Sequence, residues 1–417
     1  MNKGFLYTGE KKDCTGCGAC FNVCRHHAIT MFEDEEGFLF PRIDENLCMK
    51  CGLCYSKCPM SLNQRENAVN EAVQQHLLAT SNRCNYYKES ATIGVCTMIS
   101  SYVLGLGGVV FGACLDEGTW RVGHIKIEKK EDLHLIQNSK YAQSQIYNIY
   151  QEISSYLKQQ IIVLFIGTPC QIAGLKAFLG SSNENLFTID LICHGVYSNK
   201  ILEKEIFYWE NKYGSKVFNF KFRSKKLLDW SCGGVINFDY KDKKGIVHHV
   251  ERPGCSSPTY FCYAYSNDNN SHNLRLSCYN CKFRSEMRYG DLTVGDSWMV
   301  NFGNFRENRF IDNVKGTTLL QICTPKGQKM FSWIKGLLNV KMISLKEAYV
   351  QPALLPTNRT VPPTREMIYH VDKSEYGAFI ENLFSVSFEQ QYILYMKLYH
   401  KQRLVKIIKR VIKRIIP

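Results

Sequence analysis

The sequence predicts a small cysteine-rich α+β domain fused to a larger α/β domain. Two observations indicate this division. One cysteine spacing occurs twice within residues 1–65, whereas from about residue 85 helical periodicity alternates with short β-branched runs. The chain has 417 residues, of which 45% are hydrophobic and 22% charged, and this composition excludes global disorder and allows more than one domain.

We therefore divide the chain into four segments. They are the cysteine-rich domain at 1–65, a linker at 66–84 that runs into a helix, the α/β domain at 85–385 and a basic tail at 386–417. The 19 cysteines are expected to be reduced, since the amino terminus has no apolar signal-peptide core and the chain should stay in the cytoplasm. Clustered reduced cysteines favour metal binding over disulfides.

The first domain contains two cysteine strings with the spacing C-x2-C-x2-C-x3-C. In two-cluster ferredoxins the last cysteine of each string binds the other iron–sulfur cube. The spacing therefore predicts a ferredoxin-like domain with two four-iron clusters, one held by Cys14, Cys17, Cys20 and Cys58 and the other by Cys48, Cys51, Cys54 and Cys24. A pair of zinc sites is the alternative, but zinc has no use for a shared fourth cysteine. The domain implies one-electron transfer.

The α/β domain shows its clearest pattern between residues 160 and 192. Compact apolar runs at 160–166 and 186–192 are typical of central parallel strands, and residues 173–179 between them predict a helix. Thr168 can cap this helix and Pro169 suits its first position, which places Cys170 in the first turn.

Two other segments of this domain are informative. Residues 90–115 are uncharged and long enough to span a bilayer, but they contain five glycines. We interpret them as a buried helix, a glycine turn and a strand at 109–114. Residues 216–222 alternate in polarity and predict an antiparallel strand.

Four cysteines of the α/β domain could share one site. Cys193 ends the strand after the Cys170 helix, and neighbouring parallel strands end at one edge of a sheet, so these two cysteines can meet. Cys278 and Cys281 form a C-x2-C pair farther along. The four predict a third four-iron cluster. The alternatives are a zinc site, a nucleophilic Cys170 whose thiolate the helix dipole stabilises, or no shared site. His194 is either a proton donor beside this site or a histidine hydrogen-bonded at a strand end.

The basic tail carries much of the net charge of +14, since eight positive charges lie between residues 397 and 414 without any acid. Within 404–417 apolar residues share one face of a helix and lysines and arginines cover the other. Such a helix can lie on an anionic membrane surface, which would make the protein peripheral on the inner face of the membrane. Docking on the protein's own core is the alternative. We expect no nucleic-acid partner, since no aromatic residues within 404–417 could stack on bases.

Several motifs together resemble the coenzyme F420 hydrogenase/dehydrogenase beta subunit family, in its bacterial branch with a fused two-cluster ferredoxin domain. The matching segments are 139–144, 165–175, 190–195, 220–224, 278–281 and 290–298. The resemblance covers roughly residues 8 to 350. It implies an iron–sulfur oxidoreductase that binds FAD and passes electrons between clusters and a two-electron carrier. Members of this branch are associated with polysaccharide biosynthesis.

The resemblance also implies residues that contact a flavin or substrate. No G-x-G-x-x-G follows a predicted strand, so these candidates come from the matched motifs alone. Lys140 is a catalytic candidate, because its charge could stabilise an anionic flavin or a substrate acid, and His194 is the second catalytic candidate. The cofactor contacts implied are Ser139, Lys140, Tyr141, Gln143, Thr168, Gln171 and Asp296.

Three functions are consistent with these patterns. The leading hypothesis is a flavin-containing iron–sulfur oxidoreductase that uses a redox partner protein or a small two-electron carrier. The second is an electron-transfer subunit with clusters but no flavin or substrate of its own. The third is a redox-sensing accessory protein of glycan assembly.

Overall fold

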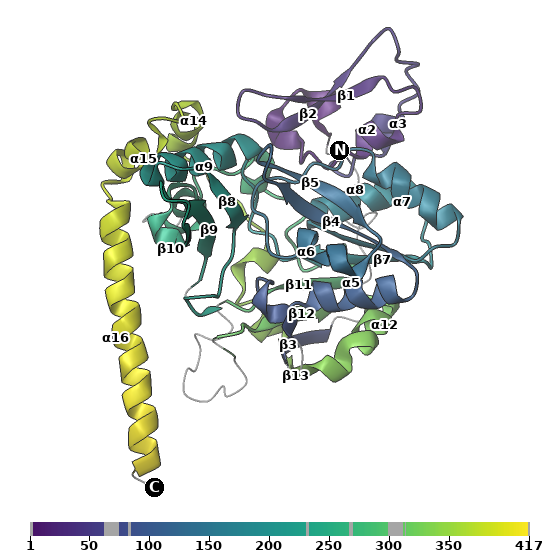
Figure 1. Ribbon diagram of the computed structural model, residues 1–417. Helices are drawn as coiled ribbons and strands as arrows, with labels where there is room; N and C mark the ends of the chain where they lie inside the picture. Colours follow the sequence, from purple (N-terminus) through teal and green to yellow (C-terminus); the bar gives the residue numbers. More distant parts are fainter. Residues whose placement is uncertain are drawn as a thin grey trace.

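The computed structural model describes residues 3–61, 75–81, 85–230, 233–266, 270–298, 312 and 314–415. Figure 1 shows the amino-terminal domain resting on one end of a larger body, from which the last helix projects.

The amino-terminal domain is a two-stranded antiparallel hairpin flanked by short helical turns. Gly18 and Gly52 stand at the amino ends of its two cysteine helices with φ values of +76° and +75°. Only glycine adopts this left-handed backbone without strain, so both strings use the same device to start a helix. The elements are α1 (Phe5–Thr8), η1 (Lys11–Asp13), α2 (Ala19–Val23), β1 (Ile29–Glu33), β2 (Leu39–Ile43) and α3 (Leu53–Ser56).

The α/β domain is built on an eight-stranded sheet of order β13-β3-β12-β11-β7-β6-β4-β5. The four strands from β11 to β4 are parallel, and the remaining neighbours are antiparallel, so the sheet is mixed. Its strands are β3 (Gln75–Ser81), β4 (Val109–Asp116), β5 (Arg121–Ile127), β6 (Val163–Gly167), β7 (Leu186–Leu191), β11 (Leu292–Asp296), β12 (Thr318–Ile322) and β13 (Leu338–Ile343).

Strand β3 corrects the predicted linker at 66–84. Its residues 75–81 pair with both β12 and β13, and all but the first are buried. The polar neighbourhood of this segment suggested a linker leading into a helix, but tertiary pairing decides its conformation. The α/β domain therefore begins before residue 85, and the rest of the predicted linker lies outside the described residues.

Helices cover both faces of the sheet, because alternate strand residues point to opposite sides. One face packs on α5 (Val95–Gly105), α6 (Leu133–Ile136) and α12 (Pro325–Ile334), and the other on α7 (Ile149–Lys158) and α8 (Pro169–Leu179). The predicted buried helix, glycine turn and strand at 90–115 are confirmed as α5 followed by β4.

A further core lies beneath a three-stranded antiparallel sheet of order β10-β9-β8, which includes the predicted strand at 216–222. Its elements are β8 (Val217–Lys221), β9 (Val235–Lys241), β10 (Val247–Pro253), α9 (Asn199–Tyr213), η5 (Gly254–Ser256), α10 (Pro258–Tyr260), η6 (Phe261–Tyr265), α14 (Thr364–His370) and α15 (Tyr376–Phe384). Phe38 and Phe40 of the amino-terminal domain belong to the same core, so the two domains share packed side chains. Shorter elements are η2 (Asn85–Lys88), η3 (Lys130–Asp132), α11 (Leu276–Tyr279), η7 (Lys335–Leu337), α13 (Leu345–Ala348) and η8 (Pro352–Leu354).

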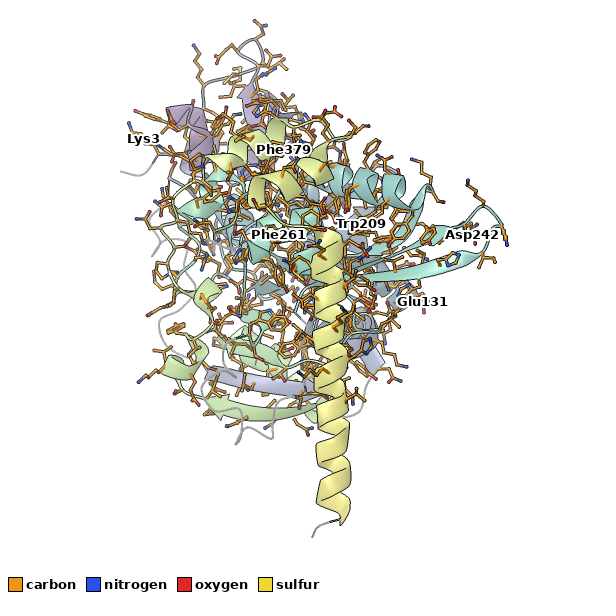
Figure 2. All side chains as sticks on the ribbon, turned by 90° about the vertical axis from the view of Figure 1, so that its left-hand side faces the viewer. Lys3, Glu131, Trp209, Asp242, Phe261 and Phe379 are labelled. Carbon is orange, nitrogen blue, oxygen red and sulfur yellow. The ribbon has the colours of Figure 1, made fainter. Side chains whose placement is uncertain are left out.

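The chain ends in the single long helix α16 (Phe388–Ile415), which leaves the body after its first turns (Figures 1 and 2). Phe388 is buried and Glu389 pairs with Lys212 and Arg252, which fixes the base of the helix. Beyond this base Ile393 and Leu398 are exposed. Within the described part of the chain, no helix is long and apolar enough to cross a membrane.

Candidate metal centres

The first cysteine group of the amino-terminal domain surrounds a cavity. Cys14, Cys17, Cys20 and Cys58 all line it, and they are the four ligands predicted for one cluster. Burial, together with the nearby charges of Cys58 and Cys14, raises the pKa of Cys17 to about 12. The backbone N–H of Gly16 donates to Cys14 Sγ at 3.4 Å, as expected where amides face cluster sulfurs.

The second group lies nearer the surface. Burial raises the pKa of Cys54, and Cys24 and Cys48 add to the effect, so these three predicted ligands are neighbours. Cys51, the fourth, is exposed, as is Met49 two residues before it. This group is therefore the accessible end of the amino-terminal domain.

The third group forms at the carboxyl ends of β6 and β7. Thr168 and Gln171 form a capping box with Pro169 at the first helical position, so Cys170 lies in the first turn of α8 as predicted. Burial raises the pKa of Cys170 well above its usual range, and the charges of Cys281, Cys193 and Cys278 act on it in addition. The four cysteines predicted to share a site are thus brought together.

Burial also decides the chemistry open to these thiols. It raises the pKa of Cys193 to about 11 and that of Cys278 to about 12. As thiolates these buried cysteines would repel one another, and bound cations such as iron would stabilise their negative charge. Burial and the charges of the three neighbouring cysteines act against a Cys170 thiolate, whereas the amino end of α8 favours one.

Among the residues that the structure describes, no three His, Cys, Asp or Glu side chains converge closely enough to hold a single metal ion. A four-iron cube binds each cysteine at a different iron atom, so its ligands stand farther apart than those of one ion.

An arginine beside the third group supports the same interpretation. The Arg284 side chain is 5% exposed, and its Nε and Nη1 atoms are buried without a hydrogen-bond partner. Burial and Arg359 lower the pKa of Arg284, and the cysteines at 193, 281 and 278 oppose this shift. Unpaired donors of a buried cation require an acceptor, and the sulfur atoms of a cluster held by these cysteines would provide one.

His194 lies beside this group. Its Nε2 atom is 2.9 Å from Ser271 Oγ, and the Arg359 guanidinium lies against the ring, with Nη1 3.4 Å from Nε2. Burial, with Arg359 and Arg284, lowers the pKa of His194 to about 3. The imidazole is therefore neutral at physiological pH and can donate only the single proton of its neutral form. Its catalytic role stays a prediction.

The predicted flavin contacts Gln143, Thr168 and Gln171 make hydrogen bonds within the protein. Gln143 Nε2 donates to Thr15 O at 2.7 Å, which ties it to the amino-terminal domain. The Gln171 side chain accepts from Thr168 N and donates to Ser144 O, so it fixes the start of α8.

Lys140 is also engaged by the backbone. Its Nζ donates to Gln137 O at 2.5 Å, with Leu135 O and Asn138 O at 3.3 and 3.4 Å. Burial lowers its pKa to about 8. The residue before it, Ser139, is half-buried.

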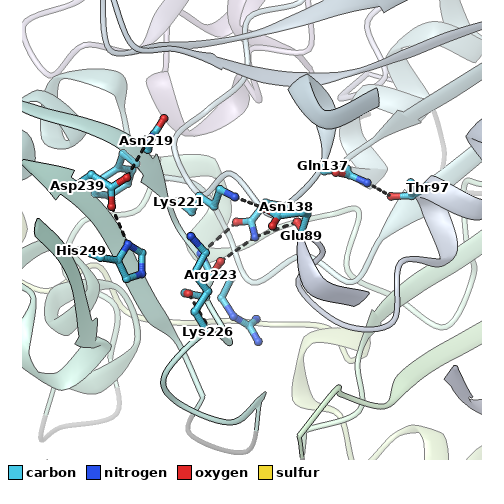
Figure 3. Close-up of polar contacts among 12 residues, drawn as sticks. Glu89, Thr97, Gln137, Asn138, Asn219, Lys221, Arg223, Lys226, Asp239 and His249 are labelled. Carbon is cyan, nitrogen blue, oxygen red and sulfur yellow. Dashed lines mark hydrogen bonds and ion pairs between the residues drawn. The ribbon is translucent and has the colours of Figure 1, made fainter. Parts of the chain in front are cut away.

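The remaining flavin candidates surround Arg223. Its guanidinium pairs with both carboxylate oxygens of Asp296, and Nη1 donates to Tyr141 Oη at 3.3 Å. Asp296 also accepts from Trp230 Nε1, and the Trp230 ring stacks on Trp298 with centroids 4.3 Å apart. Figure 3 shows the neighbouring contacts that hold the Arg223 backbone. Arg223 lies in the matched segment 220–224, but only the structure shows that it forms a buried ion pair with Asp296.

Tyr263 connects this group with the third cysteine group. Its ring is 5.1 Å from Tyr141 and 5.1 Å from His194, and its hydroxyl donates to Gly195 O. The flavin candidates therefore occupy two neighbouring regions. Tyr141 and Asp296 bond to the Arg223 side chain, whereas Gln143 and Gln171 bond to backbone carbonyls near the start of α8 and in the amino-terminal domain. Their assignment stays a prediction from the resemblance.

Two arginines that sequence reasoning missed join the domains. Arg275 is 1% exposed and donates to Cys14 O, Gln143 Oε1 and Leu39 O at 2.7, 2.9 and 3.0 Å. Arg365 forms a buried two-point ion pair with Glu36. No local pattern marks either residue, because their partners are hundreds of positions away.

Both domains of the chain are similar to known protein families. Residues 162–346 match the family described as the carboxyl terminus of the beta subunit of coenzyme F420 hydrogenase/dehydrogenase, and residues 13–62 match the 4Fe-4S dicluster domain. The resemblance to this beta subunit family is confirmed. Residues 13–62 therefore form a ferredoxin-type domain, and the α/β domain is similar to this beta subunit family.

Two curated relatives come from Methanocaldococcus jannaschii. A coenzyme F420-dependent sulfite reductase is 26% identical over 255 residues, which cover 55% of this chain and 38% of the reductase. An uncharacterised ferredoxin is 32% identical over 50 residues, 12% of this chain and 64% of the ferredoxin. The chain thus spans less than two thirds of either relative.

Among solved structures, a chain from a study of xenon derivatization of the F420-reducing [NiFe] hydrogenase complex of Methanosarcina barkeri is similar. The match has 16% sequence identity and a TM-score of 0.38. It covers 69% of this chain and 89% of that chain.

Proposed function

We propose that the protein passes single electrons from its amino-terminal cysteine centres to the α/β domain, where a two-electron carrier accepts them. The carrier implied by the resemblance is FAD. The observation that carries the proposal is the contact between Cys17 of the amino-terminal domain and Gly174, one turn beyond Cys170 on α8. Two groups of buried cysteines that adjoin in this way are expected of a chain of redox centres.

In this proposal the third group of cysteines holds a third four-iron cluster, which would supply one-electron chemistry. Arg284 would donate to its sulfur atoms and offset its negative charge. The exposed Cys51 end would receive electrons from a low-potential redox partner protein. Tyr263, between Cys193 and Tyr141, would mark the way toward the carrier.

The experiment is anaerobic purification followed by counting of iron, sulfide and flavin, and then turnover with a soluble two-electron acceptor. One bound flavin and steady turnover support an oxidoreductase with its own carrier. Clusters without flavin or turnover would instead identify a protein that only transfers electrons. If the clusters change redox state without transferring electrons onward, the result would favour the redox sensor of glycan assembly, the setting of the family branch.

The tail suggests where the protein acts. Most side chains of 404–417 lie outside the described residues, so the predicted apolar face is not described. The described part of α16 nevertheless leaves the body and exposes Ile393, Leu394, Leu398 and Leu404 beside Lys397 and Lys401. We therefore propose that α16 lies on an anionic membrane surface rather than on the protein's own core.

A further inference from the structure

The contact between α8 and the amino-terminal domain is unusually close. A Cβ atom built on Gly174 would lie 3.1 Å from both Cβ and Sγ of Cys17, nearer than ordinary van der Waals contact. Glycine therefore lets the helix approach the cysteine. Gly174 follows Cys170 by four residues, which is about 6 Å along a helix. The first and third cysteine groups approach each other across one helical turn.

Tyr150 of α7 spans this contact. Its hydroxyl lies 2.8 Å from Cys17 O and 2.8 Å from Gln171 O, so a single O–H group hydrogen-bonds to a carbonyl in each domain. The side chain is fully buried, and its ring packs near Phe165 and Phe178. A Cβ on Gly174 would also come within 3.0 Å of the same hydroxyl.

Arg275 provides a second and independent connection. Its Nε donates to Cys14 O at 2.7 Å, and its own carbonyl accepts from Cys278 N at 2.8 Å. The Arg275 guanidinium lies 4.3 Å from the centroid of the Phe40 ring, which holds it in place. Each bridge thus links one cysteine of the first group to the backbone beside one cysteine of the third.

We propose that Tyr150 and Arg275 are positioning residues that fix the separation of these two cysteine groups and hence the coupling of the redox centres they hold. The inference rests on the proposed function. One electron passes between the two groups, no bond forms or breaks, and no proton moves with it. The electron originates from a low-potential one-electron donor protein, and sodium dithionite replaces this donor in the test.

The test is low-temperature electron paramagnetic resonance of the full chain, prepared anaerobically and reduced with dithionite. Two reduced clusters that lie close together split each other's signals. The difference between the parent spectrum and the Cys170→Ala spectrum gives the part of this splitting that depends on the third group. Tyr150→Phe keeps the ring and removes only the hydroxyl, so the splitting should narrow toward the Cys170→Ala spectrum while the iron content is retained. The matched control is Tyr156→Phe, also on α7, whose hydroxyl contacts Lys126 and Glu128 away from the cysteines.

Gly174→Ala is the second variant, because its methyl group would push α8 away from Cys17. It should narrow the splitting in the same way. If both variants keep their iron and show the same splitting as the parent protein, the inference is wrong. Loss of iron from both variants also overturns it, because Tyr150 and Gly174 would then be needed to hold the clusters and not to set their separation. If Cys170→Ala loses iron but its spectrum shows the same splitting as the parent protein, the inference is wrong and the proposed function still stands. A parent without iron that depends on Cys170 overturns the proposed function as well.

Discussion

The ion pair between Glu36 and Arg365 should hold the amino-terminal domain on the body. Arg365 Nη1 and Nη2 each lie 2.6 Å from a carboxylate oxygen of Glu36, and Arg365 Nε donates to Leu274 O. The side chains are only 4% and 9% exposed. Glu36→Ala leaves the guanidinium buried without its counter-charge.

Removing one partner of a buried ion pair costs about 3–5 kcal/mol. Since each 1.4 kcal/mol is a factor of ten, about 4 kcal/mol would raise the population of the undocked domain roughly a thousandfold. Hydrogen exchange at the amides of β1 and β2 reports this opening, because a hairpin that has lost its packing against the body opens more readily. Exchange there should accelerate strongly in Glu36→Ala, while β6 and β7 in the centre of the sheet change little.

Lys216→Ala is the control, because it breaks an ion pair with Glu210 in which the lysine is 90% exposed. A surface pair of this kind contributes at most about 1 kcal/mol. If β1 and β2 exchange at the same rate in Glu36→Ala as in Lys216→Ala, the buried ion pair does not hold the domains together.

Two further predictions concern the accessible centre and the tail. Cys51→Ala should lose about four iron atoms, one cube, and keep the iron that depends on Cys170, as metal analysis can check; loss of all iron would show that the groups are not independent. A chain ending at Arg403 should sediment less with anionic vesicles than the full chain, because it lacks five positive charges worth up to about 1 kcal/mol each near the surface, and binding should weaken with salt. Equal amounts of both forms in the supernatant at low salt would refute the membrane proposal.

The sequence predicted best what is determined locally. The strands β6 and β7, the capped start of α8 and the position of Cys170 follow from periodicity and from the order Thr168-Pro169-Cys170. The parallel pairing of β6 with β7 then explains how Cys170 and Cys193 meet. In each case neighbouring residues carry the information.

The features that were missed depend on distant partners. Residues 75–81 form strand β3 because they pair with β12 and β13, which lie far along the chain. The roles of Arg275 and Arg365 likewise depend on their partners in the amino-terminal domain. The ammonium group of Lys140 contacts three backbone carbonyls, and its role toward a ligand stays a prediction. Such contacts arise when the chain folds back on itself, and no spacing in the sequence encodes them.

Metal content tests most directly whether the third cysteine group is a redox centre joined to the ferredoxin domain. The iron and sulfide of the full chain and of Cys170→Ala are measured after anaerobic preparation, with Cys96→Ala as a control for loss of a cysteine on α5 outside the three groups. We expect about twelve iron atoms in the parent and control and about eight in Cys170→Ala, since each cube holds four. About eight iron atoms in all three proteins, or zinc in place of iron, would contradict this assignment.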